Sequence, residues 1–346
     1  MNQEEIARQL NQVMVDLLVQ DGHIKTPSLE RAFREVFRHR FLPNEISAAD
    51  IYQDKTIILK KSSIDGPLES GLPISSSTMP GLLASILEAA DIRPGLHVMH
   101  VGTGPGYLAA LIGNLVTVSG EVITIEIDTD IAIQAQEKYS ALGYQNIRCI
   151  ASDGSTGYPA KAPYQRIIIT ASCADVPESW KQQIDRNGFL VLPLSLSQRA
   201  SLYPMMVFEK IGDHLIGKVA SNLVTVGFIP MYGDHVSYRV QYDKTITKLE
   251  SAIFHNIRSQ MAFADNKSIT LIALLEIASA IESGPDSIES IEAKAIYDQS
   301  INKWQQLKQP KVEDFEFHLL ANNQLLRDHN WHFNKQNHTL FVRVLS

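Results

Sequence analysis

The strongest constraint on the fold is an alternation of strand-like and helical apolar patterns between residues 82 and 193. Apolar runs typical of buried strands occupy 96–101, 121–125, 147–151, 166–170 and 189–193. Helical periodicities occupy 82–89, 107–116, 131–142 and 180–184. Alternating units of this kind fold as a mostly parallel sheet with helices on both faces. The sequence therefore predicts an α/β fold.

The segments before and after this alternation have different patterns. Two helices are expected before it, at 6–18 and from Ser28 until Pro43 ends the second. The arginines of that second helix are predicted to form a solvated face; they are Arg31, Arg34, Arg38 and Arg40. Beyond it, the expected elements are edge strands at 205–209 and 215–224, helices at 246–258, 269–281 and 289–307, and strands at 315–320 and 339–345.

These patterns divide the chain into three predicted parts. Residues 1–75 form an N-terminal helical segment and substrate-side cap, residues 76–235 the ligand-binding core, and residues 236–346 a C-terminal extension of helices and strands. A boundary near 235–245 follows from the change of pattern after Gly233. We expect the extension to contribute to recognition of a peptide substrate.

Composition excludes several classes of function. The chain has 346 residues, 31 basic against 38 acidic, a net charge of −7 that argues against a nucleic-acid binder. No apolar run approaches the roughly 20 residues that span a bilayer, and no signal core is visible, so no membrane partner is expected. Two cysteines, Cys149 and Cys173, fit a reducing cytoplasm.

Metal chemistry has no support in the sequence. The 11 histidines are scattered, without a His-Glu-x-x-His motif or paired cysteine sites, so no metal is predicted. His329 and His332 flank Trp331, where a packed aromatic cluster is favoured over an exposed recognition patch.

A glycine-rich turn carries the clearest ligand signal. The predicted strand 96–101 runs directly into Gly102, Gly104 and Gly106, and a predicted helix follows. Glycines allow a ligand to approach the backbone closely, and the N–H groups of the next helix point toward it. A purely structural glycine turn is the alternative.

Polar residues also follow the next three predicted strands. Glu126 ends one strand, about 20 residues after the glycine turn, where a carboxylate can accept hydrogen bonds from both hydroxyls of a ribose. Asp153 follows the next strand and can accept the amino group of an adenine, and Thr170 follows the fourth. Open α/β sheets bind ligands at the carboxyl ends of their strands. The four positions together therefore predict a nucleoside-containing ligand.

These residues resemble the class I S-adenosylmethionine-dependent methyltransferases, and more specifically the protein-L-isoaspartate O-methyltransferase family. The resemblance covers roughly residues 25–235. It rests on the segments 32–43, 74–79, 102–107, 126–128, 153–155, 162–171 and 228–231. It implies a Rossmann-like fold, S-adenosylmethionine as cofactor without a metal, and a peptide or protein substrate that carries Asp or isoAsp.

The resemblance also implies roles for individual residues. Ser75 would orient the substrate carboxylate. Ser76, Thr78, Phe228, Pro230 and Met231 would bind the substrate. The residues implied in cofactor binding are Ser77, Gly102, Thr103, Gly104, Gly106, Tyr107, Glu126, Ile127, Asp153, Gly154 and Thr170. For Ser76, Ser77 and Thr78, capping of the helix that follows is an alternative role.

The chain departs from the family pattern at three places. His100 stands where the family usually has an acid, the segment 69–73 replaces a Gly-Gln-Thr approach, and the residues after Gly233 have no counterpart in compact repair enzymes. Together these features resemble the extended relatives that modify ribosomally made peptides, including the "FxLD system" methyltransferases. This favours esterification of an Asp side chain in a precursor peptide, leading to a succinimide or isoaspartate. Repair of aged proteins and a non-catalytic adaptor are the alternatives, and the oligomeric state is left open.

Overall fold

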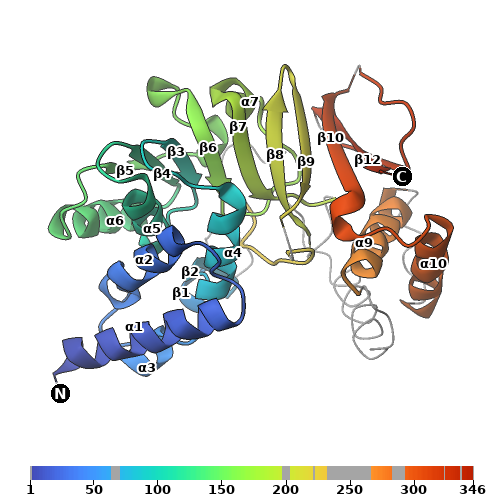
Figure 1. Ribbon diagram of the computed structural model, residues 1–346. Helices are drawn as coiled ribbons and strands as arrows, with labels where there is room; N and C mark the ends of the chain where they lie inside the picture. Colours follow the sequence, from blue (N-terminus) through green and yellow to red (C-terminus); the bar gives the residue numbers. More distant parts are fainter. Residues whose placement is uncertain are drawn as a thin grey trace. The chain divides into compact units, whose positions relative to one another are not determined.

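The structure is a computed structural model in which two compact units can be described (Figure 1). The described residues are 2–63, 71–196, 203–220, 223–231, 266–282, 293–322, 324–335 and 337–345. Of these, 2–170 and 183–189 belong to the first unit, and the remainder to the second. The predicted boundary near 235–245 and the predicted helix at 246–258 lie outside the described residues.

The first unit contains the predicted β/α alternation. Its elements are α1 (Gln3–Gln20), α2 (Pro27–Glu35), η1 (Arg38–Phe41), α3 (Ala48–Ile51), β1 (Ile57–Lys61), β2 (Pro73–Ser77), α4 (Pro80–Ala90), β3 (His97–Val101), α5 (Tyr107–Val116), β4 (Glu121–Glu126), α6 (Thr129–Ala141), β5 (Ile147–Ala151), η2 (Gly154–Thr156), η3 (Pro159–Lys161) and β6 (Tyr164–Ile169). The strand β7 (Ile184–Pro193) begins in this unit.

A parallel sheet in the order β6-β3-β4-β5 forms the centre of this unit (Figure 1). Val101 on β3 aligns with Ile125 on β4 and with Ile169 on β6, so these strands end at nearly the same level. The strands are almost continuously apolar because a parallel sheet is covered on both faces. Helices α5 and α6 pack on them, and α5 is buried over nearly all its length.

Two features of the N-terminal region differ from prediction. Helix α2 ends at Glu35 rather than near Pro43, because Val36 is extended and the chain then turns Arg38 into the interior. The antiparallel pair β1–β2 was not expected, and β2 contains Ser75, Ser76 and Ser77. A serine run has weak strand propensity, so pairing with a distant segment decides its conformation.

The second unit contains an antiparallel sheet in the order β11-β12-β10-β9-β8. Its elements are α7 (Glu178–Gln183, whose last residue falls in the first unit), the end of β7, β8 (Met205–Ile211), β9 (His214–Val219), α9 (Asn266–Glu282), α10 (Ala293–Gln306), η6 (Val312–Asp314), β10 (Phe315–Ala321), β11 (Trp331–Asn334) and β12 (His338–Val344). The predicted helices at 269–281 and 289–307 and strands at 315–320 and 339–345 are therefore confirmed within a few residues. Strand β11 was missed because it has four residues.

The segment 228–231, part of the family resemblance, forms only an isolated parallel bridge in the described part of the chain. Ser172 N donates to Ile229 O at 3.0 Å, and Met231 N donates to Ser172 O at 3.0 Å. Pro230 between them has no N–H to donate, so the ladder does not extend.

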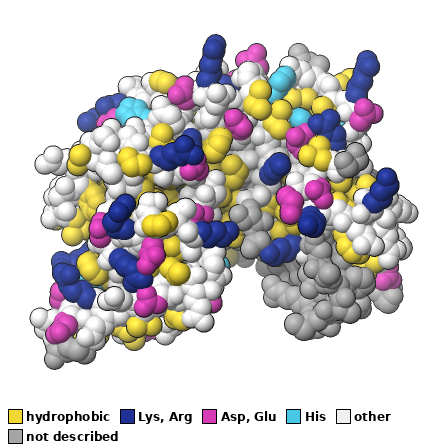
Figure 2. Space-filling view, in the orientation of Figure 1, with side chains coloured by type: hydrophobic (Ala, Val, Ile, Leu, Met, Phe, Trp, Pro, Cys, Tyr) yellow, Lys and Arg dark blue, Asp and Glu magenta, His cyan; other side chains and the backbone are white. Residues whose placement is uncertain are grey.

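The surface and the remaining predictions can be checked against the described residues. Figure 2 shows basic and acidic side chains interspersed over the face it displays. Among the helices described, none is long and apolar enough to cross a membrane. Cys149 and Cys173 are both free thiols. The predicted aromatic cluster is confirmed only in part: the His329 ring lies edge-on to His332 and Phe341, but His332 is exposed and Trp331 stacks on Phe315 instead.

Candidate active site

The parallel strands bring the predicted ligand residues to one edge of the first unit. Gly102 follows β3, Glu126 is the last residue of β4, Asp153 follows β5 and Thr170 follows β6. The backbone connects these ends, because Gly102 N donates to Ile125 O at 2.9 Å and Ser152 N to Glu126 O at 2.9 Å. The geometry required of a ligand site at the carboxyl ends of the strands is therefore present.

The glycine turn is shaped by close contacts that exclude larger residues. Gly102 has φ +97°, and a Cβ there would lie 2.8 Å from Thr170 Oγ1. Gly104 has φ +52°, and a Cβ there would lie 3.2 Å from the Ser76 carbonyl oxygen. L side chains rarely adopt such φ values, so both positions need glycine. The second contact places the turn directly against the serine strand β2.

Glu126 is a buried carboxylate held by backbone donors. It is 8% exposed, and its oxygens accept from Gly104 N at 2.9 Å and from Asp128 N at 3.2 Å. Burial raises the pKa of Glu126 above its ordinary value, and the backbone hydrogen bonds counteract that rise in part. No cation of the described residues lies within 4 Å of it. A carboxylate can accept about four hydrogen bonds, so capacity for ligand hydroxyls remains.

His100 braces the glycine turn from inside the sheet. It is fully buried, with Nδ1 at 2.9 Å from Thr124 Oγ1 and Nε2 at 3.0 Å from Thr170 Oγ1. Thr170 donates its one hydroxyl proton to the Gly102 carbonyl at 3.0 Å, so Nε2 of His100 is the donor and Nδ1 the acceptor. Burial lowers the pKa of His100 to about 3, so the ring is neutral at physiological pH. The residue that replaces the expected acid is thus packed, not ligand-facing.

The serine strand is fixed by Arg38, whose role the sequence did not reveal. Arg38 is fully buried, and its guanidinium donates to Ser77 Oγ at 3.2 Å and to the carbonyls of Ser77 and Thr78. It also donates to Ile51 O at 2.7 Å, while no carboxylate among the described residues lies within 4 Å of it. The prediction that Arg38 belongs to a solvated face is therefore wrong. Charge spacing suggested an exposed helix, but the helix ends before this residue.

Ser75 is the other buried serine of β2. It is 6% exposed, and its Oγ has no hydrogen-bond partner within the part of the chain that the structure describes. Alternation along a strand puts Ser75 and Ser77 on the same side of β2. The alternative role of Ser76, Ser77 and Thr78 as helix caps is wrong, because Met79 is the N-cap of α4 and no side chain caps that helix.

An ion pair that the sequence did not predict adjoins this edge of the sheet. Lys60 on β1 contacts Asp128 with 2.5 Å between Nζ and Oδ2. Asp128 is also the N-cap of α6, where it accepts from Ile131 N. The pair therefore connects β1 to the loop that follows Glu126.

The other predicted residues have identifiable environments. Thr103 bonds to Thr124 at 2.6 Å between hydroxyl oxygens, and Ile127 follows Glu126 directly. The Tyr107 ring is buried edge-on to Phe33, so its backbone N–H in the first turn of α5 is the part available to a ligand.

Asp153 and Gly154 shape the turn after β5. The Asp153 carboxylate accepts from Ser155 N at 2.8 Å, and a Cβ on Gly154 would lie 2.3 Å from Val101 Cγ1. Phe228, Pro230 and Met231 belong to the second unit. Their assignment to the substrate, like each cofactor contact above, stays a prediction. No group of three or more potential metal ligands occurs among the described residues.

Comparison with known proteins places this geometry in a family context. A family model described as Protein-L-isoaspartate(D-aspartate) O-methyltransferase (PCMT) matches residues 8–235. The protein-L-isoaspartate O-methyltransferase of Ignicoccus hospitalis is 36% identical over 214 residues, which are 62% of this chain and 93% of that protein.

Two solved structures share the fold. One, a protein-L-isoaspartate O-methyltransferase, has a TM-score of 0.59 at 20% identity and covers 89% of this chain and 96% of its own. The other is a Plasmodium falciparum structure described as a beta-aspartate methyltransferase (PCMT) in complex with S-adenosyl-L-homocysteine. Its TM-score is 0.53 at 18% identity, and it covers 64% of this chain and 98% of its own. These matches confirm the predicted class I methyltransferase fold.

Proposed function

The chain belongs to the protein-L-isoaspartate(D-aspartate) O-methyltransferase family, and from this premise we propose that it uses S-adenosylmethionine to esterify the carboxylate of an aspartyl or isoaspartyl residue. One observation carries the proposal. The hydrogen bond from Gly104 N to Glu126, 2.9 Å long, joins the glycine turn to a buried carboxylate, and the same glycine lies against Ser76 next to Ser75. Residues expected to bind the cofactor therefore lie next to residues expected to bind the substrate, which supports the proposal.

The residues present fit S-adenosylmethionine. Glu126 is a buried acceptor with remaining capacity, as a ribose diol requires. The close approach of Gly102 to Thr170 leaves no room for a side chain at the turn. When bound, the cofactor supplies a methyl group already activated by a sulfonium. Glu126 would hold the ribose, and Asp153 and Gly154 would lie at the base.

The chain's own contribution to the reaction is positioning and exclusion of water. A carboxylate acceptor has a reference pKa near 4 and is ionised at neutral pH, so no strong general base is required. Alignment of reactants can lower a barrier by about 7–11 kcal/mol. Ser75 supports this role because the residue is only 6% exposed and its hydroxyl has no partner within the described chain. It would donate to one carboxylate oxygen and leave the other to react.

Replacement of Ser75 tests this mechanism. Ser75→Ala should lower kcat for methyl transfer by about 10–100-fold, because an orienting donor is lost. Its affinity for S-adenosylhomocysteine, measured by calorimetry, should stay at the wild-type value. The exposed Ser28 provides the matched control, and Ser28→Ala should leave both quantities unchanged. Wild-type turnover in Ser75→Ala would remove Ser75 from the mechanism.

For the acceptor, we propose an Asp side chain in a ribosomally made precursor peptide, whose ester then closes to a succinimide and can reopen as isoaspartate. Three features support this choice. His100 replaces the usual acid, the residues 69–73 replace the usual approach to the Ile-Ser motif, and the family model does not extend beyond residue 235. The long extension would then serve peptide recognition.

Repair of isoaspartyl proteins is the second candidate, and one observation favours it. A solved protein-L-isoaspartate O-methyltransferase covers 89% of this chain, which must include residues after 235. An extension alone therefore does not argue for peptide tailoring. Mass spectrometry separates the two candidates. A repair enzyme should methylate many unrelated isoaspartyl peptides, whereas a tailoring enzyme should ignore them and methylate unmodified Asp in one precursor.

A non-catalytic adaptor with a methyltransferase fold is the remaining alternative. Loss of the glycine turn or the acidic ligands would favour it, but Gly102, Gly104, Gly106, Glu126 and Asp153 are all present. Calorimetry with S-adenosylmethionine decides the matter, since an adaptor that has lost the site would show no binding heat.

A further inference from the structure

The C-terminal turn between β11 and β12 makes buried polar contacts that the proposed reaction does not use. Asp175 and His338 are both 1% exposed, and His338 Nδ1 lies 3.0 Å from Asp175 Oδ1. The other Asp175 oxygen accepts from Asn337 N at 2.8 Å. The two contacts span 162 and 163 positions of the sequence, and they hold the turn before β12 against the loop that follows Thr170.

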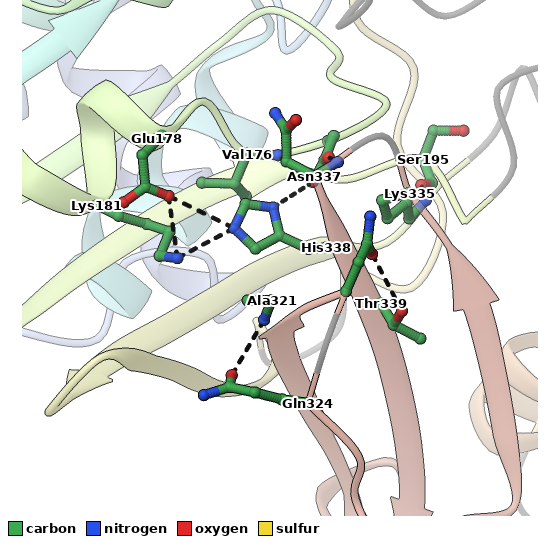
Figure 3. Close-up of polar contacts among 12 residues, drawn as sticks. Val176, Glu178, Lys181, Ser195, Ala321, Gln324, Lys335, Asn337, His338 and Thr339 are labelled. Atoms are coloured by element: carbon green, nitrogen blue, oxygen red, sulfur yellow. Dashed lines mark hydrogen bonds and ion pairs between the residues drawn. The ribbon is translucent and has the colours of Figure 1, made fainter.

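His338 continues this network toward α7. Figure 3 shows His338 beside Lys181 and Glu178, with 3.1 Å from His338 Nε2 to Lys181 Nζ. Lys181 in turn pairs with Glu178 at 3.1 Å. Since Lys181 donates to Nε2, the imidazole proton resides on Nδ1 and is donated to Asp175. The ring is thus fixed in one tautomer and one orientation.

A second contact from the same turn reaches the end of β7. Lys335 is 7% exposed and lies beside Ser195 (Figure 3). Its Nζ donates to the carbonyls of Ser195 and Leu196. The two anchored loops are themselves paired, because Ser195 N donates to Cys173 O at 2.8 Å. The turn therefore holds two loops that already contact each other.

The loop anchored by Asp175 pairs with the segment 228–231, which is expected to bind the substrate. Ser172, three residues before Asp175, pairs with Ile229 and Met231 through two hydrogen bonds of 3.0 Å. Cys173 Sγ also lies 3.6 Å from Met231 Sδ. A continuous path of contacts thus runs from His338 through Asp175 and Ser172 to the segment 228–231.

We propose that Asp175 and His338 are positioning residues for the substrate-binding segment 228–231, so that the C-terminal extension sets peptide affinity through this buried contact. The proposal rests on the proposed function, because it takes 228–231 to face the peptide. The extension then acts on the peptide through the core loop.

Substitution at His338 tests the proposal. His338→Leu removes the donor to Asp175 and should raise KM for the peptide by about tenfold or more, because small misplacements have effects of this size. In the same variant, kcat should stay within about twofold of wild type, and the Kd for S-adenosylhomocysteine should not change, since the cofactor residues belong to other elements. His338→Asn keeps an N–H donor near the Nδ1 position and should restore most of the peptide affinity.

His332, exposed on the neighbouring strand, supplies the matched control, and His332→Gln should leave KM unchanged. If His338→Leu does not fold, Lys335→Met provides the test. It removes the contacts with Ser195 and Leu196, and it should also raise KM for the peptide without changing kcat or cofactor affinity. An unchanged KM in these variants, or a parallel loss of kcat and cofactor affinity, would overturn the proposal. Wild-type protein that methylates no peptide would instead refute the proposed function.

Discussion

Each unit of this chain buries a carboxylate, and the two carboxylates are held in different ways. Glu126 is reached by backbone N–H groups from within the stretch 104–128. Asp175 accepts from the neighbouring Val176 N at 2.7 Å, and also from the side chain of His338, 163 residues away. The first arrangement is local and leaves acceptor capacity, whereas the second closes a network between distant segments.

The difference indicates what each group does. A buried charge without a counterion is costly, and part of that cost is recovered when a ligand donates hydrogen bonds to it. Glu126 has this character and is a candidate ligand group. Asp175 is satisfied by the protein itself, so it serves the folded structure. Replacing Glu126 should therefore mainly reduce cofactor affinity, whereas replacing Asp175 should mainly reduce folding stability.

The largest expected effect is on stability at Asp175. Asp175→Ala leaves His338 and the backbone N–H groups of Val176 and Asn337 without their acceptor. Each buried donor left without an acceptor costs about 1–3 kcal/mol of unfolding free energy. Glu126→Ala should cost the free protein clearly less, because burial raises the pKa of Glu126, so that its removal also relieves the cost of burying that charge. Urea unfolding of both variants measures this, and equal losses would contradict the distinction drawn between the two carboxylates.

The next effect tests how closely the ligand edge is packed. Gly102→Ala adds a Cβ 2.8 Å from Thr170 Oγ1 at a positive φ. Backbone strain of about 1–2 kcal/mol and overpacking of about 1–3 kcal/mol should together lower the free energy of unfolding, and cofactor binding should be lost.

Gly143 is the matched control for this substitution. It has φ +80° but nothing within 4 Å of an added Cβ, so Gly143→Ala should show the strain alone, about 1 kcal/mol, and retain cofactor affinity. Equal losses in the two alanine variants would show that crowding against Thr170 has no part in the turn.

A third effect concerns the acid sensitivity of the first unit. The pKa of buried His100 is lowered to about 3 from an ordinary 6.5, so the unfolded chain takes up a proton below about pH 6.5 while the folded chain does not. Stability therefore falls as pH decreases through this window, by about 2 kcal/mol at pH 5 from this residue.

His100→Gln should remove that contribution, and His332→Gln, at an exposed position, should not. Unfolding free energies at pH 7 and pH 5 provide the measurement. If wild type and His100→Gln lost the same stability over this step, the titration of His100 would not be the cause.

Sequence reasoning worked best where structure is set locally. The strands around Val101 and Ile125 are continuous apolar runs, and the glycine turn follows one of them directly, so both the parallel sheet and its ligand edge could be predicted. Glu126 was found for the same reason, since it ends a strand whose position was already clear.

The features that were missed depend on contacts between distant segments. Arg38 is buried because carbonyls of Ile51 and Ser77 converge on it, which charge spacing along a helix does not reveal. The contact between Asp175 and His338 joins positions 163 residues apart, and neither residue lies in a recognisable motif. Pattern and spacing describe single elements, whereas these residues acquire their roles from the packing of several elements.

The smallest expected effect is on the pH dependence of cofactor affinity. Burial raises the pKa of Glu126, so the folded protein holds this proton more tightly than the unfolded chain does. The ionised carboxylate therefore costs the free protein stability at neutral pH, and that cost disappears as pH falls. Glu126→Gln should accordingly leave the free protein at least as stable as wild type at pH 7, although it binds S-adenosylhomocysteine more weakly.

The ionised form of Glu126 is the better acceptor for ribose hydroxyls, so wild-type affinity should decline as pH falls through the raised pKa. The decline should begin above the ordinary glutamate value of 4.5 and approach about tenfold per pH unit below the pKa. Calorimetry with S-adenosylhomocysteine between pH 7.5 and about 5 measures it. Glu126→Gln should show a flat profile, while Asp130→Asn, at an exposed neighbouring carboxylate, should keep the wild-type decline. A decline that persisted in Glu126→Gln would mean that another group titrates at this edge, and Glu126 would lose its assigned role.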